Sequence, residues 1–244
     1  MAGGACYEAI DELERSPMTT IAMIPARMGS QRLAKKNLRE LDGVSLIARA
    51  IRRCHSAGCF DEVWVNSEHP DFGPIAESEG AKFHQRPDHL GSNTATSEDF
   101  VEEFLNVHEC DWVVQVHSIA PLVTVSELRG FVDRLGQDDL DVLLSCEPIQ
   151  IECAMGGQPV NFTFDAKTNS QELEPIQRIS WSLTAWRRAA FLQARADGGC
   201  ATYAGQVGFH PLGPLAAHVI KTQLDLDIAH ALLGIVEQGG ESTI

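Results

Sequence analysis

The stretch IAMIPARMGSQRLAKKN, residues 21–37, begins as an apolar run and turns abruptly into a loop of small and basic residues. The run IAMIPA predicts a fully buried first strand. Gly29 and Ser30 allow backbone N–H groups to approach an anion closely, and Arg27 and Lys36 can neutralise its charge. We interpret this strand and loop as a site for a nucleoside triphosphate.

Apolar runs alternate with helical patterns up to about residue 149. The predicted strands are 21–26, 62–67, 82–87, 111–118 and 141–148. The predicted helices are 45–58, 70–81, 97–108 and 124–136, and Ser97 is the expected cap of the third. This alternation predicts an α/β fold with a mostly parallel sheet that helices cover on both faces.

The alternation breaks near residue 149, and we interpret residues 149–190 as an insertion or dimer arm. Residues 156–165 alternate in polarity like an exposed strand. The run HVIKTQLDLD, 218–227, predicts a return to strand, and IAHALLGIVEQGG, 228–240, predicts a final helix.

The length of 244 residues suits one α/β domain, which we place at 19–244 after a leader at 1–18. A formal charge of -15 argues against nucleic acid and anionic membranes as partners, so an anionic substrate needs a local cluster of cations. Seven scattered cysteines without a CxxC pair indicate free thiols. With no secretory signal and no apolar run of membrane-spanning length, we expect a cytoplasmic protein.

The basic loop lacks both common phosphate-binding patterns, since neither G-x-x-x-x-G-K-[ST] nor G-x-G-x-x-G is present. The alternative interpretation is a solvated loop in which cations happen to cluster. Its position at the carboxyl end of the first strand favours a ligand site, because open α/β sheets bind ligands at that edge.

The pattern I-P-A-R-x-G-S-x-x-x-x-x-K-N resembles the signature of the acylneuraminate cytidylyltransferases, which make CMP-activated sialic acids and related nonulosonates. Its matched positions are Ile24, Pro25, Ala26, Arg27, Gly29, Ser30, Lys36 and Asn37. The resemblance covers most of residues 21–235 and is weak between 149 and 215. It implies a three-layer Rossmann-like fold of the nucleotide-diphospho-sugar transferase type, with a small dimerisation excursion in a homodimer.

The resemblance also implies a reaction, in which the anomeric hydroxyl of an acidic sugar attacks the α-phosphorus of CTP and pyrophosphate leaves. Arg27 and Lys36 are then expected to stabilise the leaving group, together with N–H groups of the loop. The implied nucleotide-binding residues are Ala26, Arg27, Met28, Gly29, Ser30, Lys36, Asn37, Arg86, Ala95 and Ser97. The expected acceptor-binding residues are Gln115, His117 and Ser118, although His117 is equally well explained as a structural histidine.

Asp225 and Asp227 alternate with leucines in the predicted strand 218–227, where residues two apart point to one side. Paired carboxylates are ligands for Mg²⁺, and the metal-binding aspartates of the resembled family match both positions. We therefore expect them to bind Mg²⁺, with Asp227 catalytic. The alternative is that Asp227 caps the helix that follows and Asp225 is merely exposed.

Departures from the family pattern concentrate on the acceptor side. Gln31 replaces a common lysine, the stretch 115–123 lacks the family's arginine, and 181–186 replaces its N-G-A-x-Y. The acceptor therefore stays open among a sialic, legionaminic or pseudaminic acid, an octulosonate and a phosphonate. Two other interpretations are a catalytically silent nucleotide-binding relative and a glycosyltransferase, although the latter more naturally carries its D-x-D in mid-chain.

Overall fold

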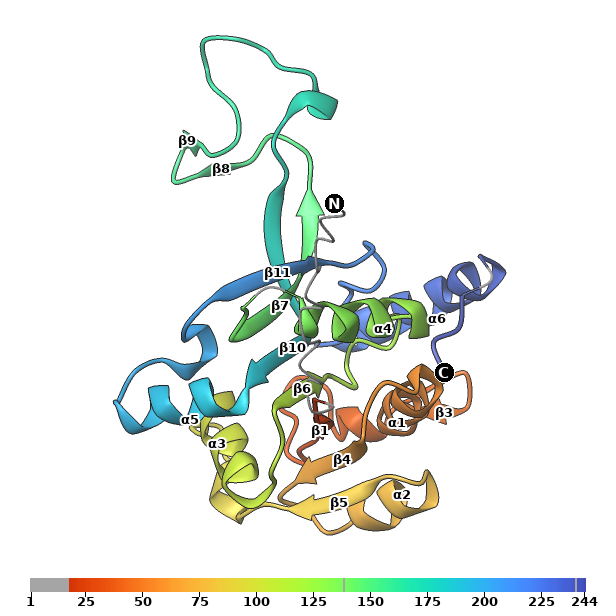
Figure 1. Cartoon of the computed structure of the whole chain (residues 1–244). Helices are drawn as coiled ribbons and strands as arrows, with labels where there is room; N and C mark the ends of the chain where they lie inside the picture. Colours follow the sequence, from red (N-terminus) through yellow and green to blue (C-terminus); the bar gives the residue numbers. More distant parts are fainter. Residues whose placement is uncertain (1–17, 138, 240) are drawn as a thin grey trace, which may run out of the picture.

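A seven-stranded sheet forms the centre of the computed structural model, which describes residues 18–244 except 138 and 240 (Figure 1). The strand order is β11-β7-β10-β6-β1-β4-β5. The bounds are β1 Thr20–Pro25, β4 Glu62–Ser67, β5 Lys82–Gln85, β6 Trp112–Val116, β7 Val142–Ile149, β10 Ile176–Arg187 and β11 Val207–Pro211. Only β10 is antiparallel to its neighbours, which confirms the predicted mostly parallel sheet.

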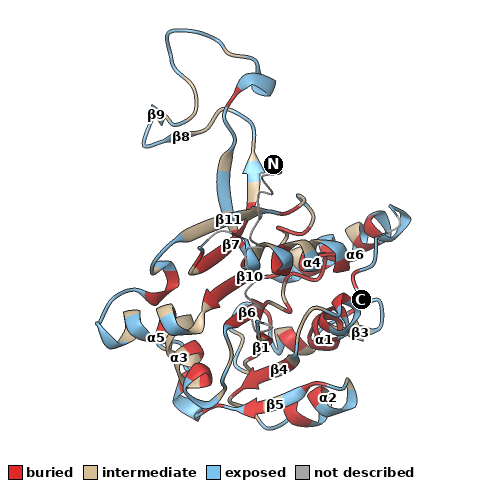
Figure 2. Cartoon of the chain, viewed as in Figure 1, coloured by how far each residue is buried: buried red, intermediate tan, exposed pale blue. Residues whose placement is uncertain are grey.

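Helices cover both faces of this sheet. They are α1 Leu46–Ala57, α2 Phe72–Ser78, α3 Ser97–Val107, α4 Val125–Asp133, α5 Arg188–Ala196 and α6 Gln223–Gln238. Alternate residues of β1 enter two cores: Ala22 and Ile24 pack on the side of α1, α2 and α4, whereas Ile21 and Met23 pack on the side of α3 and α5. The buried residues accordingly line the strands and the inward helix faces (Figure 2).

Short elements complete the fold. They are the 3₁₀ turns η1 Lys36–Leu38, η2 Asp88–Gly91, η3 Arg134–Gly136, η4 Ser170–Glu172 and η5 Ala201–Tyr203, and the two-residue strands β2 Glu40–Leu41, β3 Val44–Ser45, β8 Ala154–Met155 and β9 Gln158–Pro159. Within the described ranges, no helix combines the length and the apolar character that a membrane span requires.

Local capping sets where α1 and α3 begin. Ser45 accepts a hydrogen bond from the backbone N–H of Ala48, and the left-handed Gly58 ends α1 as predicted. At α3 the predicted cap was wrong by one residue. Thr96 is the cap and forms a reciprocal capping box with Asp99, so Ser97 is the first helical residue.

The predicted strand at 218–227 was wrong, because α6 already begins at Gln223. Thr222 caps it and the Asp225 carboxylate bonds back to the Thr222 backbone N–H, a second capping box. Residues two apart on a helix differ by about 200° in direction. Asp225 and Asp227 therefore do not share a face, contrary to the expected pair.

The middle segment differs in extent from the predicted arm at 149–190. Residues 176–187 form β10, which lies between β6 and β7 in the sheet, and only 150–175 project away from it (Figure 1). The exposed strand expected at 156–165 was wrong, since only β9 pairs there, with β8. The edge strand β11 was not predicted. The expected leader lies outside the described residues except for Met18.

Candidate active site

The strand order places β1 at a switch point, with β4 on one side and β6 on the other. Loops that leave such neighbouring strands in opposite directions open a crevice at their carboxyl ends. A cleft of about 180 Å³ lies there. Its lining includes eight predicted site residues, Ala26, Arg27, Ser30, Lys36, Asn37, Arg86, His117 and Ser118. The topology thus gathers residues that are up to about ninety positions apart.

Lys36 lies at the centre of a cluster of cations. Burial, which has the largest effect, and the charges of Arg32, Arg27 and Lys221, in that order, together lower the pKa of its ammonium group to about 8. Asp225 is the carboxylate that opposes them. Such a concentration of positive charge is unfavourable without an anion, so the cleft is electrostatically prepared for one.

Lys221 was missed by the sequence analysis. It lies just before α6 and is 185 positions from Lys36, so no spacing in the sequence connects the two. The acidic partner Asp225 is in the same turn, where its carboxylate accepts the backbone N–H of Lys221 at 2.9 Å.

The loop after β1 is braced from several directions. Asn37 donates from its amide to the carbonyl of Arg27 at 3.1 Å and accepts from the hydroxyl of Ser118 at 2.9 Å. Both polar ends of this buried amide are therefore occupied. Asn37, one of the residues expected to bind the nucleotide, thus joins the loops after β1 and β6.

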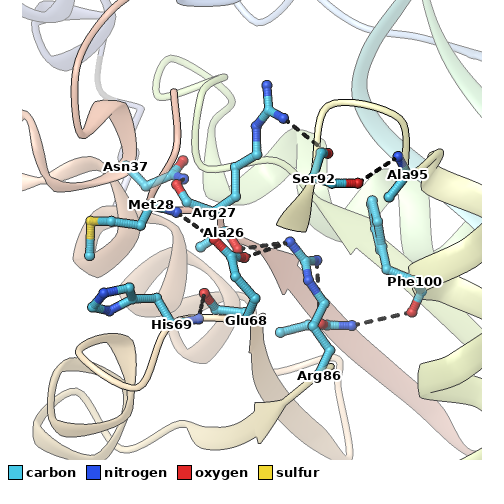
Figure 3. A network of polar contacts seen from close by, with 12 residues as sticks. Ala26, Arg27, Met28, Asn37, Glu68, His69, Arg86, Ser92, Ala95 and Phe100 are labelled. Carbon is cyan, nitrogen blue, oxygen red and sulfur yellow. Dashed lines mark hydrogen bonds and ion pairs between the residues drawn. The ribbon is translucent and has the colours of Figure 1, made fainter. Parts of the chain in front are cut away.

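Gly29 and Ser30 lie in the middle of the same loop. The Ser30 N–H is bonded to the carbonyl of Met28 at 3.0 Å, and a Cβ placed on Gly29 would meet nothing within 4 Å. Arg27 donates to the side-chain oxygen of Asn93 at 3.1 Å and to the carbonyl of Ser92 at 3.5 Å. The contact with Ser92 links the loop to the segment that carries Ala95 (Figure 3).

A second residue that the sequence analysis missed is Glu68, directly after β4. One carboxylate oxygen accepts the backbone N–H of Met28 at 2.9 Å, and the other accepts from the guanidinium of Arg86 at 3.1 Å (Figure 3). Arg86 itself is buried, stacks over the ring of Phe100, and donates to the carbonyl of Ala26 at 3.1 Å. Burial lowers the pKa of Arg86, while the charge of Glu68 opposes that shift.

The three predicted acceptor-binding residues have different surroundings. Gln115 is buried in β6, and its amide lies 2.7 Å from the Nε2 atom of His117. Burial, with a smaller effect from the charge of Lys36, lowers the pKa of His117 to about 4, so the ring is neutral at pH 7. His117 and Ser118 line the cleft. Ser118 is engaged with Asn37, and Gln115 does not line the cleft.

Ala95 lines a hollow of about 610 Å³ next to α3 and does not line the cation-rich cleft. Asp99, Glu102 and Glu103 line the same hollow and make it unsuitable for phosphates. The nearby Ser97 caps no helix and begins α3. The structure therefore places Ala95 and Ser97 beside the cleft and not in its lining.

Asp225 and Asp227 differ in their suitability as metal ligands. Asp225 is partly buried, and one of its oxygens accepts three hydrogen bonds from Lys221 and Thr222. Burial raises the pKa of Asp225, but these bonds outweigh burial and hold the pKa below its usual range. Asp227 is exposed and bonds to Gln223. In the described part of the chain, no three His, Cys, Asp or Glu side chains form a metal-binding group.

A second hollow of about 350 Å³ adjoins the cation cluster through Lys221 and Asp225. Arg178, Trp181 and His218 also line it. The backbone of Trp181 has a φ of 59°, in the left-handed region, at an irregularity in the pairing of β10 with β7. A bulky residue rarely adopts this conformation, and Trp181 is 37% exposed.

Known proteins with similar sequences are cytidylyltransferases. N-acylneuraminate cytidylyltransferase A of Danio rerio is 30% identical over 125 residues, which cover 51% of this chain and 29% of that protein. Pseudaminic acid cytidylyltransferase of Campylobacter jejuni subsp. jejuni serotype O:23/36 (strain 81-176) is 27% identical over 169 residues, 64% of this chain and 73% of that protein. The chain thus spans less than a third of the length of the Danio rerio relative.

Similar solved structures confirm the Rossmann-like fold. CMP:2-keto-3-deoxy-manno-octonic acid synthetase complexed with CTP aligns with a TM-score of 0.67 and 17% identity, over 88% of this chain and 98% of its own. For 4-diphosphocytidyl-2C-methyl-D-erythritol synthase from Anaerococcus prevotii, the TM-score is 0.63 and the identity 12%, over 89% of this chain and 99% of its own. Residues 21–183 match the sequence family described as Cytidylyltransferase. Because that match covers more than half of the residues, the chain belongs to the cytidylyltransferase family.

Proposed function

We propose that this protein transfers CMP from CTP to an acidic sugar and releases pyrophosphate. The observation that carries the proposal is the cluster of Arg27, Arg32, Lys36 and Lys221 at the switch point of the sheet. A triphosphate would relieve the mutual repulsion of these cations, which Asp225 offsets only in part. Membership of the cytidylyltransferase family selects CTP as the nucleotide.

The proposed reaction forms one bond and breaks one. A hydroxyl oxygen of the acceptor bonds to the α-phosphorus, the bond from that phosphorus to the bridging oxygen breaks, and its electron pair leaves with pyrophosphate. The hydroxyl proton is released. Negative charge grows on the leaving group, so fixed cations beside the β- and γ-phosphates stabilise the transition state more than the ground state. Arg27 and Lys36 have this role in the proposal.

The proposed acceptor is a nonulosonate such as a sialic, legionaminic or pseudaminic acid. Similar proteins are named for N-acylneuraminate and pseudaminic acid, which supports this class. The 350 Å³ hollow beside Lys221 offers a place for it, with Lys221 to balance a carboxylate and Trp181 to pack against the sugar. Arg178, which also lines the hollow, is paired with Glu147. Its position next to the cation cluster would bring the acceptor to the α-phosphate.

We further propose that Mg²⁺ takes part and that Asp225 helps to hold it. No described residue hydrogen-bonds the second oxygen of Asp225, and Mg²⁺ commonly binds one or two carboxylates together with substrate phosphates and water. When bound, the ion would neutralise phosphate charge. The helical geometry supports Asp225 more than Asp227 as a ligand, although both were expected to bind it.

We also propose a cytoplasmic homodimer in which the projecting segment 150–175 contacts a second copy. This segment is largely exposed (Figure 2). Its apolar residues Ile151, Met155, Val160 and Phe164 are between 53% and 77% exposed, an unusual accumulation of apolar surface on one arm. Sedimentation should give a dimer for the wild type and a monomer for Met155→Asp with Phe164→Asp. A monomeric wild type at working concentration contradicts the proposal.

The activity test is pyrophosphate release from CTP and Mg²⁺ with a panel of nonulosonates, octulosonates and phosphonates. We expect release with CTP and a nonulosonate, and its loss in Lys36→Ala. Lys82→Ala is the matched control, because Lys82 lies on β5 in an exposed ion pair with Glu62. CTP binding without release for any acceptor indicates a silent relative. Release with UTP or ATP but not CTP contradicts the cytidine assignment.

A further inference from the structure

We propose that Glu68 is a positioning residue that joins the phosphate loop and Arg86 into one unit, so that the triphosphate and nucleoside halves of the site form together. The inference rests on the proposed binding of CTP. None of the sequence motifs assigns a role to Glu68, which enters the site only through the fold.

The two carboxylate oxygens of Glu68 hold two different parts of the site. The first accepts the backbone N–H of Met28 at 2.9 Å, in the loop that faces the cation cluster. The second accepts from the guanidinium of Arg86 at 3.1 Å, on the side of Phe100 (Figure 3). Since the side chain is only 13% exposed, water competes weakly for either bond.

Arg86 depends on Glu68 for its charge balance. The side chain of Arg86 is 2% exposed, and no described residue hydrogen-bonds its Nε atom. Its other acceptors are the carbonyl of Ala26 and, at 3.4 Å, the side-chain oxygen of Asn66, both uncharged. Glu68 is the ion-pair partner and has a larger effect on the Arg86 charge than the more distant Glu103, so its removal would leave a buried charge without its paired carboxylate and free Arg86 to seek another acceptor.

Packing keeps Glu68 in this position. A Cβ added to Gly91, the last residue of η2, would lie 2.4 Å from Cγ and 2.5 Å from Cδ of Glu68. The backbone of η2 therefore closes directly over the carboxylate. Gly91 is required there because any larger residue would displace the Glu68 side chain.

A glutamine cannot reproduce this arrangement. Both partners of Glu68 are donors, whereas an amide offers one acceptor and one donor group. In Glu68→Gln, either the Met28 N–H or Arg86 faces an N–H₂ group and loses its bond. Because the Met28 amide and Arg86 lie on opposite sides of one carboxylate, a shift on one side is transmitted to the other.

The test measures binding of two separate probes, CMP and inorganic tripolyphosphate, by isothermal titration calorimetry without metal. Wild type should bind both, and Glu68→Gln should bind each about tenfold or more weakly, as expected for a lost charge-assisted bond. Gly91→Ala should reproduce both losses while it keeps the charge of Glu68. Gly136→Ala is the control, because its Cβ meets nothing within 4 Å.

Several outcomes would overturn the inference. A lowered melting temperature in Glu68→Gln with unchanged affinity for both probes indicates a purely structural role. Weakening of one probe alone shows that Glu68 does not join the two halves. If Glu68→Gln does not fold, Gly91→Ala decides on the same criteria. A wild type that binds neither probe instead contradicts the proposed function, and the inference falls with it.

Discussion

Lys36 should make CTP binding depend on pH in a range where few other groups titrate. Burial and the neighbouring cations Arg32, Arg27 and Lys221 lower the pKa of Lys36 to about 8. The ammonium form attracts phosphate and the neutral amine does not. Affinity for CTP should therefore be highest below the pKa and should fall as the pH rises through about 8.

The size of the effect follows from the protonated fraction. With a pKa of about 8, about 90% of Lys36 is charged at pH 7 and about 10% at pH 9. Bound phosphate raises the pKa, so the complex keeps its proton over this range and the free protein must take one up to bind. The expected loss between pH 7 and pH 9 is about tenfold in affinity, or about 1.4 kcal/mol.

The assay is calorimetric titration of CTP at constant ionic strength, in half-unit steps from pH 7 to pH 9.5, without metal or acceptor. Lys36→Arg is the matched control, because arginine stays charged throughout this range. Its affinity should be nearly independent of pH. An equal slope in wild type and Lys36→Arg, or a flat wild-type profile, would refute the assignment of the titration to Lys36.

Three further predictions concern other parts of the site. Asp225→Asn should lower Mg²⁺-dependent turnover about 10–100-fold or more, whereas Asp227→Asn should change it little, because only Asp225 faces the cations. Equal losses of turnover in both variants would contradict this assignment of the two aspartates on α6. Asn37→Ala should cost about 1–3 kcal/mol in urea unfolding because two buried hydrogen bonds are lost, and an unchanged midpoint would show that the brace is dispensable. His117, with its pKa lowered to about 4, binds a proton more weakly in the folded than in the unfolded state, so stability should fall from pH 6.5 to pH 4 by up to about 3 kcal/mol. Thermal unfolding should show a smaller loss in His117→Asn, and an equal loss would assign the effect to other groups.

The elements that the sequence predicted well are those with a strong local pattern. The strand β1 is an unbroken apolar run and the helix α1 has a clear helical period, and both have clear ends, so their bounds differ from the prediction by one residue at each end. None of the residues of strand β11 is buried, and the strand includes Gly208 and Pro211. Its sequence therefore lacks the apolar pattern by which a strand is predicted. Its place in the sheet is set by pairing with β7.

The error at 218–227 has an identifiable cause. The alternation L-D-L-D matches the period of a strand. In the helix α6, however, Leu226 is buried whereas Leu224 is exposed. The spacing of Thr222 and Asp225 was the better signal, because Thr-x-x-Asp resembles a capping box. The capping box, and not the alternation, therefore indicates the structure that this segment adopts.

The site was predictable where it follows one strand and not where the fold brings distant segments together. Arg27, Ser30 and Lys36 belong to a single loop, and their place at a switch point follows from the topology of the sheet. Glu68 and Lys221 are single charged residues, and the residues next to them in the sequence form no recognisable phosphate-binding motif. Their roles depend on which loops meet at the carboxyl edge, and no spacing along the chain encodes that.

The position of β10 has a consequence for how the chain acquires its structure. The strands β1, β4, β5 and β6 all lie within residues 20–116 and can pair with one another as soon as these residues are available. The outer edge of β6, however, stays open until residues 176–187 insert between β6 and β7. Because every residue of β6 is buried in the finished sheet and four of the five are apolar, a nascent or refolding chain exposes an unpaired, largely apolar strand edge during that interval. Aggregation during synthesis or refolding should therefore start at β6.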